Sequence, residues 1–196
     1  MDIDERDLIE RTKSGDNRAF DQLVKQYQRK VFGIAYGIVR DPEDALDVCQ
    51  DVFLRAYRNL GHFKGDSKFY TWIYRITVNL SIDYIHKKRK APMLMHDDTR
   101  MVEDFCIDQD ALHGARTSPV RHLDTKELGE RVSSCFERLS EKHRAVLILR
   151  EVEGLSYKEI AQAVRCSRGT VMSRLFHARN NMKSMLQAYL DGEDDA

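Results

Sequence analysis

Residues 154–185 read GLSYKEIAQAVRCSRGTVMSRLFHARNNMKSM, which is the pattern of two helices joined by a very short turn. Ser156 and Glu159, three residues apart, form a capping box and predict the start of the first helix. Its expected apolar face, at helical spacing, consists of Ile160, Ala161 and Val164. Arg165 and Cys166 are expected to make the turn.

The second helix, which Ser167 is expected to cap, separates apolar from polar positions. Its predicted inward face consists of Val171, Leu175 and Ala178. Its other faces carry basic and hydroxyl side chains that suit contacts with duplex DNA, namely Arg168, Thr170, Ser173, Arg174, His177 and Arg179. This arrangement is typical of a helix-turn-helix, whose second helix enters the major groove. The alternative is a helical hairpin with a purely structural role.

The composition indicates a soluble, all-helical protein of one or two domains. The chain has 196 residues, of which 33% are charged and only three are prolines. No apolar run reaches the roughly 18 residues of a membrane span, and no signal segment precedes a cleavage site, so we expect a cytoplasmic protein without membrane insertion. The four cysteines are scattered without a CxxC pair, which argues against a disulfide or zinc framework.

The net charge is zero, but the distribution of charge favours a nucleic-acid partner. Residues 1–91 hold 17 basic and 14 acidic side chains, and residues 128–190 hold 11 and 6. Residues 92–127 hold 4 basic and 8 acidic side chains, and residues 191–196 hold 4 acidic ones and no basic one. A DNA-binding surface needs only a local excess of positive charge, so the neutral total does not exclude one.

Residues 1–91 are predicted to form the first of two small helical domains. Its expected helices cover residues 5–13, 17–39, 42–60 and 69–89. Asp16 and Asp41 are placed to cap the second and third of these helices, and Pro42 occupies a favourable first helical position.

The helical periodicity is lost over residues 92–125, which predicts a flexible acidic linker. Residues 126–190 are predicted to form the second domain, with helices over 127–139 and 140–151 before the helix-turn-helix. Residues 191–196 form an acidic tail.

The third predicted helix carries an acidic stripe, Asp44, Asp47, Gln50 and Asp51, beside an apolar one. The apolar stripe consists of Ala45, Val48, Val52, Phe53 and Ala56. The acidic stripe has three interpretations: a metal site, for which no second ligand set stands nearby, a solvated surface, or a docking face for a basic partner protein. We favour the docking face.

The fourth predicted helix is rich in aromatic residues, namely Phe69, Tyr70, Trp72, Tyr74 and Tyr84. They alternate with polar and basic residues that include Lys68, Arg75, Asn79 and the run 87–90. Rings beside positive charge suit single-stranded nucleic acid, and the preceding loop offers a pocket for one unstacked base through His62, Phe63, Lys64 and Ser67. The alternative is a core role, which we expect for Ile73, Ile76, Leu80 and part of Trp72.

The remaining candidate ligands do not form a recognisable metal or catalytic motif. His96, His113, His122 and His143 follow spacings that match no common zinc frame, even with Cys106 added. A phosphate loop and a nucleophile motif are both missing from the sequence. We therefore expect no metal, no cofactor and no catalysis.

The chain resembles bacterial RNA polymerase sigma factors of the extracytoplasmic-function (ECF) group over nearly all of both domains. In the first domain the resemblance rests on DPEDA at 41–45, DVF at 51–53 and YTWIYRI at 70–76, with Asn79. In the second domain it rests on EIA at 159–161, GTVMSRL at 169–175 and Ala178-Arg179. These segments form three motifs, over residues 41–53, 70–79 and 159–179. Their order and spacing along the chain make this a specific resemblance.

The resemblance implies a non-enzymatic protein that binds core RNA polymerase and directs it to promoters. The third helix would dock on the clamp coiled coil of the large β′ subunit through Asp44, Asp47, Gln50, Asp51, Phe53 and Leu54. The melted −10 strand would be held by His62, Phe63, Lys64, Ser67, Tyr70, Arg75 and Asn79. The −35 duplex would be bound by the helix-turn-helix residues named above, the linker would pass through polymerase, and an anti-sigma factor would hold the protein inactive.

Two positions depart from the family pattern. Arg165-Cys166 stands in the turn where a glycine is common, so the backbone there is expected to differ. Asp83 stands where many relatives have a neutral polar residue, and its carboxylate would repel a DNA phosphate. Two other functions compete with this interpretation: a helix-turn-helix regulator that binds duplex DNA alone, and a small helical enzyme that uses a divalent metal at the third helix.

Overall fold

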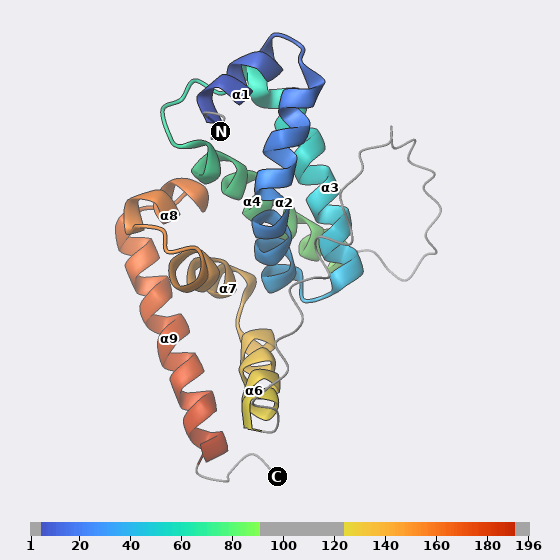
Figure 1. The fold of residues 1–196 in the computed structure, drawn as a ribbon. Coiled ribbons are helices and arrows are strands. Elements are labelled where there is room, and N and C mark those ends of the chain that lie inside the picture. Colours follow the sequence, from blue (N-terminus) through green and yellow to red (C-terminus); the bar gives the residue numbers. More distant parts are fainter. Residues whose placement is uncertain (1–4, 91–123, 191–196) are drawn as a thin grey trace. The chain divides into compact units, whose positions relative to one another are not determined.

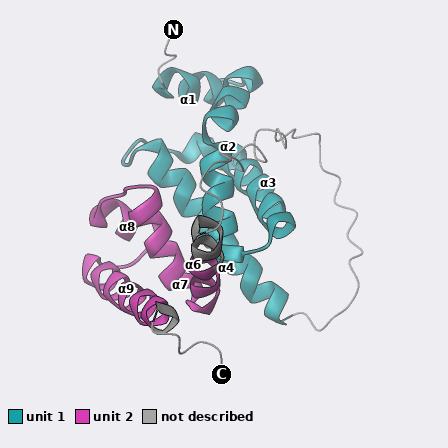
Figure 2. Cartoon of the chain, turned by 60° about the horizontal axis from the view of Figure 1, so that its bottom comes forward, with its two compact units in different colours: residues 1–115 teal, residues 116–196 magenta. Residues whose placement is uncertain are grey.

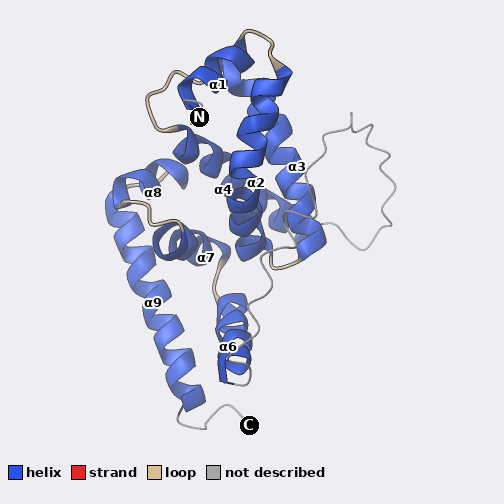
Figure 3. Cartoon of the chain, in the orientation of Figure 1, coloured by secondary structure: helices blue, strands red, loops and turns tan. Residues whose placement is uncertain are grey.

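The computed structural model describes residues 5–90 and 124–190. The chain divides into two compact units, unit 1 over residues 1–115 and unit 2 over residues 116–196 (Figure 2). In the described part of the chain every regular element is helical, as predicted (Figure 3). None of the described helices has the length and apolar composition needed to cross a membrane. The predicted linker over 92–125 lies almost entirely outside the described residues, and the predicted tail lies wholly outside them.

Over residues 5–90, unit 1 contains four α-helices that end within a residue of their predicted bounds (Figure 1). They are α1 (Glu5–Lys13), α2 (Asn17–Val39), α3 (Pro42–Asn59) and α4 (Phe69–Lys90), with a 3-10 turn over Leu60–His62. Helices α2, α3 and α4 pack against one another, and α1 packs on α2.

Local capping explains where α2 and α3 begin. The Oδ1 atom of Asp16 accepts hydrogen bonds from the backbone N–H groups of Arg18 and Ala19, at 3.0 and 3.2 Å. Asp41 caps α3 in the same way, accepting from the backbone N–H of Asp44 at 2.9 Å, and Pro42 is the first residue of the helix. Both caps satisfy N–H groups that a helix leaves without partners.

The core of unit 1 follows the apolar stripes of its helices, with one correction on α4. Ile73 is 1% exposed, as expected, but Ile76 and Leu80 are only half-buried. Thr77 and Ser81 occupy the inward face instead, both 0% exposed. Their hydroxyls donate to helix carbonyls four residues earlier, at 2.9 and 2.8 Å, so burying them leaves no unsatisfied polar group.

Unit 2 contains α6, α7, α8 and α9, in which α9 packs on each of the other three (Figure 1). Their bounds are α6 (Asp124–Arg138), α7 (Glu141–Leu147), α8 (Tyr157–Ala163) and α9 (Arg168–Leu190). The predicted helix over 140–151 is divided, because α7 passes into a π-helical segment over Ile148–Val152.

The helix-turn-helix has the predicted capping box, in which the Ser156 hydroxyl accepts from the Glu159 backbone N–H and the Glu159 carboxylate accepts from that of Ser156. The inward face of α9 is confirmed, since Val171, Leu175 and Ala178 are at most 1% exposed. On α8 the fully buried residues are Ile160 and Ala163, whereas Ala161 and Val164 are half-buried. Arg165, at the predicted turn, has a φ of 51°, a left-handed conformation that favours glycine.

Candidate nucleic-acid interface

The first turns of α9 present a cation and hydroxyls to solvent. Arg168 and Ser173 are exposed. The Thr170 hydroxyl lies 2.9 Å from the Ser167 hydroxyl, whose oxygen also accepts from the Thr170 backbone N–H at 3.0 Å. Thr170 is therefore tied to the cap of the helix, while Arg168 and Ser173 extend outward.

His143 of α7 lies near Arg174 and His177 of α9. Burial lowers the pKa of His143, and the neighbouring His177 and Arg174 lower it further. Arg174 is half-buried, with its Nη1 atom 3.9 Å from the sulfur of Cys166, and His177 is exposed. The predicted helix over 140–151 contains His143, but the sequence did not predict that this side chain lies near Arg174 and His177. The lowered pKa favours the neutral form of His143, so the guanidinium of Arg174 is the permanent positive charge at this place.

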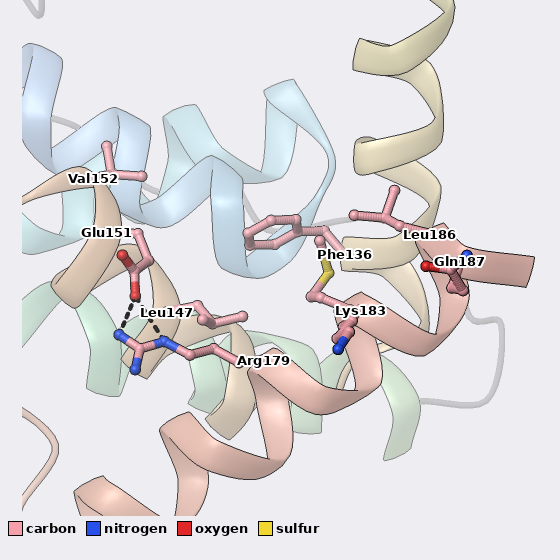
Figure 4. A pocket seen from close by; sticks show the side chains of 9 residues that line it. Phe136, Leu147, Glu151, Val152, Arg179, Lys183, Leu186 and Gln187 are labelled. Carbon is pink, nitrogen blue, oxygen red and sulfur yellow. Dashed lines mark hydrogen bonds and ion pairs between the residues drawn. The ribbon is translucent and has the colours of Figure 1, made fainter. Parts of the chain in front are cut away.

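Arg179 differs from the other α9 candidates in its contacts. Its Nη2 and Nε atoms donate to Oε1 of Glu151, at 2.6 and 3.1 Å (Figure 4). Since the helix turns about 100° per residue, Arg179 lies roughly 120° around α9 from Ser173. A DNA phosphate would have to compete with Glu151 for this guanidinium.

A mostly apolar groove lies next to this ion pair, lined by α6, the α7 region and α9 (Figure 4). Its lining residues are Phe136, Leu147, Glu151, Val152, Arg179, Met182, Lys183, Leu186 and Gln187. Val152 is 71% exposed at its rim. The sequence pattern gave no sign of the groove, because its lining comes from three separate helices.

In unit 1 the loop over residues 61–67, which contains Gly61 and Gly65, packs over the start of α4. The ring of Phe63 lies 5.2 Å from that of Trp72 and 5.7 Å from that of Phe69. Phe63 is 9% exposed and Trp72 is 8% exposed, so both rings belong mainly to the core. In the predicted base pocket only the edge of the Phe63 ring is therefore accessible for stacking. His62 and Lys64, on either side of Phe63, are exposed.

The outward face of α4 continues from this loop. Asn79 is seven residues after Trp72, almost two full turns, so it lies on nearly the same side of the helix. Arg75 and Asn79 are half-buried, as are Ile76 and Leu80 beside them, and Asp83 is exposed. Tyr70 is half-buried with the Lys68 ammonium 5.4 Å from its ring centre, and Ser67 is also half-buried. The α4 face is thus partly apolar and partly polar, and lies in line with the loop.

The predicted docking residues of α3 share one side of the helix, with one exception. Asp47 is exposed, and Gln50, Asp51 and Leu54 are half-buried. Phe53 is 0% exposed, because it belongs to the apolar stripe of α3 that packs in the core. This corrects the prediction for Phe53: its side chain is inaccessible to a partner and supports the surface from within.

Asp44, also predicted to dock, is held inside unit 1. Its Oδ1 atom accepts from the Tyr84 hydroxyl and its Oδ2 atom from the Lys88 ammonium, both at 2.7 Å. Burial raises the pKa of Tyr84, and its hydrogen bond to Asp44 raises it further. The Asp44 side chain is 15% exposed. Asp44 therefore fastens the start of α3 to the end of α4.

The described residues contain no group of three or more histidine, cysteine or acidic side chains placed to hold a metal ion. Two helical units, the second with a helix-turn-helix, define the class of the protein as DNA-binding.

The comparisons with known proteins identify the family. Residues 23–91 match the model of sigma-70 region 2, and residues 129–182 match the model of sigma-70 region 4. The RNA polymerase sigma-H factor of Pseudomonas aeruginosa is 41% identical over 186 residues, which cover 95% of each chain. The ECF RNA polymerase sigma-E factor of Escherichia coli is 38% identical over 180 residues, covering 92% of this chain and 93% of the relative.

Solved structures agree on the fold. The structure of CnrH in complex with the cytosolic domain of CnrY has a TM-score of 0.66 at 25% identity and covers 94% of this chain and 97% of that one. The sigma factor RpoE of Bartonella quintana, solved with the anti-sigma factor NepR, has a TM-score of 0.64 at 20% identity and covers 86% of this chain and 96% of that one.

The chain belongs to the ECF group of RNA polymerase sigma factors. It is therefore a non-enzymatic transcription initiation factor with a DNA-binding region 4, and family membership implies core RNA polymerase and promoter DNA as its partners. Because the similarity spans both units, it excludes an independent helix-turn-helix regulator and a metal-dependent enzyme.

Proposed function

We propose that unit 2 binds the −35 duplex through the outward face of α9. Arg168, Ser173 and Arg174 contact base edges or phosphates. The observation that carries this proposal is the accessible start of α9, where Arg168 and Ser173 are exposed and Arg174 follows as a half-buried third polar side chain. Positive side chains on and beside a recognition helix are the usual means of seating it in the major groove.

The α3 surface is proposed to dock on the clamp coiled coil of the large β′ subunit of polymerase. It consists of Asp47, Gln50, Asp51 and Leu54, which combine carboxylates with one apolar side chain. Its support is that all four are at least partly accessible on one side of the helix, while the opposite side fills the core. An acidic surface of this kind suits a basic partner helix.

Replacing Asp44 by asparagine tests whether this residue contacts polymerase or instead holds α3 to α4 within unit 1. We expect the free energy of unfolding of unit 1 to fall by about 1–2 kcal/mol, because Tyr84 and Lys88 lose a charged acceptor. Polymerase affinity is expected to stay within about twofold, since Asp44 is already occupied. Urea unfolding and titration of labelled core polymerase measure the two quantities.

Asp47→Asn is the matched control, because it removes the same charge one turn further along α3 at an exposed position. It is expected to weaken polymerase binding and to leave stability unchanged. If Asp44→Asn behaves like this control, Asp44 belongs to the docking surface after all.

The loop over 61–67 and the outward face of α4 are proposed to hold the melted −10 strand. Asn79 provides an amide that can pair with the edge of an unstacked base, and Lys64 and Arg75 lie near the phosphates. The support for this proposal is the packing of Phe63 on Trp72, which brings the loop into line with Asn79. The exposed carboxylate of Asp83 would repel a DNA phosphate, and it therefore limits which −10 sequences can bind.

Asn79→Ala is expected to slow open-complex formation at least tenfold while polymerase affinity stays unchanged, because the lost amide contacts DNA alone. This factor corresponds to about 1.4 kcal/mol, the range of one base contact. Permanganate footprinting of the melted strand and a core-binding titration give the two readouts. A greater loss in core binding than in melting would remove Asn79 from the −10 pocket.

Domain assignment follows from these surfaces: residues 1–91 act at polymerase and the −10 strand, and residues 126–190 act at the −35 duplex. The acidic connector between them is proposed to pass through polymerase toward the path of nascent RNA. CnrH was solved with the cytosolic domain of CnrY, and RpoE with an anti-sigma factor. We propose that an anti-sigma factor likewise holds this protein inactive in the cytoplasm by covering both binding units.

A gel-shift comparison tests the proposal. The free protein is expected to bind promoter DNA weakly, and addition of core polymerase is expected to produce a sequence-specific complex. Tight sequence-specific binding by the protein alone would contradict the proposed dependence of promoter binding on core polymerase.

A further inference from the structure

The outward side of α9 carries an apolar strip as well as its polar contacts. Met172 is 56% exposed, and Phe176, one turn later, is 61% exposed. The inward-facing Val171 and Leu175 of the same helix are 0% and 1% exposed. Met172 and Phe176 therefore contribute little to the core of unit 2, and two neighbouring large apolar side chains on a binding helix point to a partner surface.

The position of Met172 places this strip within the proposed −35 surface. Met172 directly precedes Ser173 and lies one turn after Arg168, both of which are exposed. Gly169 lies three residues before Met172, and a Cβ built on it meets only the Ser167 hydroxyl oxygen, at 3.7 Å. Gly169 therefore adds no side chain to the surface beside Met172.

The chemistry of methionine limits what it can recognise in a major groove. Its side chain has no hydrogen-bond donor for N7, O6 or O4 of a base. The C5-methyl group of thymine is the apolar feature that the major groove presents. We propose that Met172, flanked by Phe176, reads the methyl group of one thymine in the −35 element and is a specificity-determining residue. This inference rests on the proposed −35 role of unit 2.

The experiment removes single methyl groups from the DNA. Duplexes are first selected from a library with a randomised −35 element by binding to holoenzyme, made from the full chain and core polymerase. Each thymine of the selected −35 element is then replaced in turn by deoxyuridine, which differs from it only by the methyl group. At one thymine we expect the wild-type holoenzyme to bind about three- to fivefold more weakly, the effect of exposing one such group.

The Met172→Ala holoenzyme is expected to bind the thymine and deoxyuridine duplexes equally at that position and to keep any response at other positions. Val152→Ala is the matched control, since it truncates an apolar side chain that is 71% exposed outside α9. It is expected to keep the full wild-type ratio. Because each result is a ratio of two duplexes on the same holoenzyme, differences in polymerase affinity cancel.

Three outcomes overturn the inference while leaving −35 recognition intact: selected duplexes without thymine, a wild type with no deoxyuridine response, or a response that persists in Met172→Ala. The last result would assign the methyl contact to another residue, such as Phe176. A wild-type holoenzyme without any preference in the −35 element would overturn the proposed −35 role as well.

Discussion

Replacing Phe53 by alanine is expected to destabilise unit 1 by about 3–5 kcal/mol, because a fully buried ring is exchanged for a cavity. Phe53 is 0% exposed on the inner side of α3. Small domains have a total stability of only about 5–15 kcal/mol, so this change removes a large part of it. Thermal and urea denaturation of the full chain, followed by circular dichroism, measure the loss.

The contrast with Gln50→Ala makes this prediction specific. Gln50 is half-buried on the outer side of the same helix, and its truncation is expected to change stability by less than about 0.5 kcal/mol while weakening polymerase binding. Phe53→Ala is expected to weaken polymerase binding only to the extent that unit 1 unfolds. A stable Phe53→Ala protein that fails to bind polymerase would return Phe53 to the docking surface.

Arg174→Ala is expected to weaken holoenzyme binding to promoter DNA by about 1–3 kcal/mol. Arg174 is half-buried beside Cys166, and within residues 5–90 and 124–190 its guanidinium forms no salt bridge. Its charge is therefore available to DNA, unlike that of Arg179, which is paired with Glu151. Fluorescence anisotropy with a labelled −35 duplex on holoenzyme measures the change.

Two comparisons decide which part of the DNA Arg174 contacts. Equal weakening on promoter and random duplexes, with a reduced salt dependence, identifies a phosphate contact. Arg174→Lys is then expected to retain most of the affinity, because it keeps the charge. A loss confined to the promoter duplex, which lysine does not restore, identifies a bidentate base contact.

The sequence was sufficient for those features of the fold that depend on nearby residues. Asp16, Asp41 and Ser156 cap their helices through groups two or three residues away, so the helix starts were readable from short patterns. The inward face of α9 was likewise readable, because Val171, Leu175 and Ala178 repeat at helical spacing. The family resemblance then supplied the roles of the two units, which spacing alone does not indicate.

Features that depend on distant residues were not predictable in this way. Asp44 belongs to the acidic stripe that was predicted to dock. Its partners Tyr84 and Lys88, however, come from α4, 40 and 44 positions later. Phe53 was assigned to the docking surface by the family resemblance, although its place in the apolar stripe of α3 already indicated the core, where it is 0% exposed. The pairing of Arg179 with Glu151 similarly depends on how α9 packs against the preceding segment.

Run-off transcription with purified core polymerase tests most directly whether this chain is a promoter-specific initiation factor. Core polymerase with the protein is expected to start transcription at one defined position on templates that carry a selected promoter, and core polymerase alone is not. Loss of either the −10 or the −35 element from the template is expected to abolish the transcript. Failure of the protein to bind core polymerase, or binding without initiation at defined sites, would contradict this function.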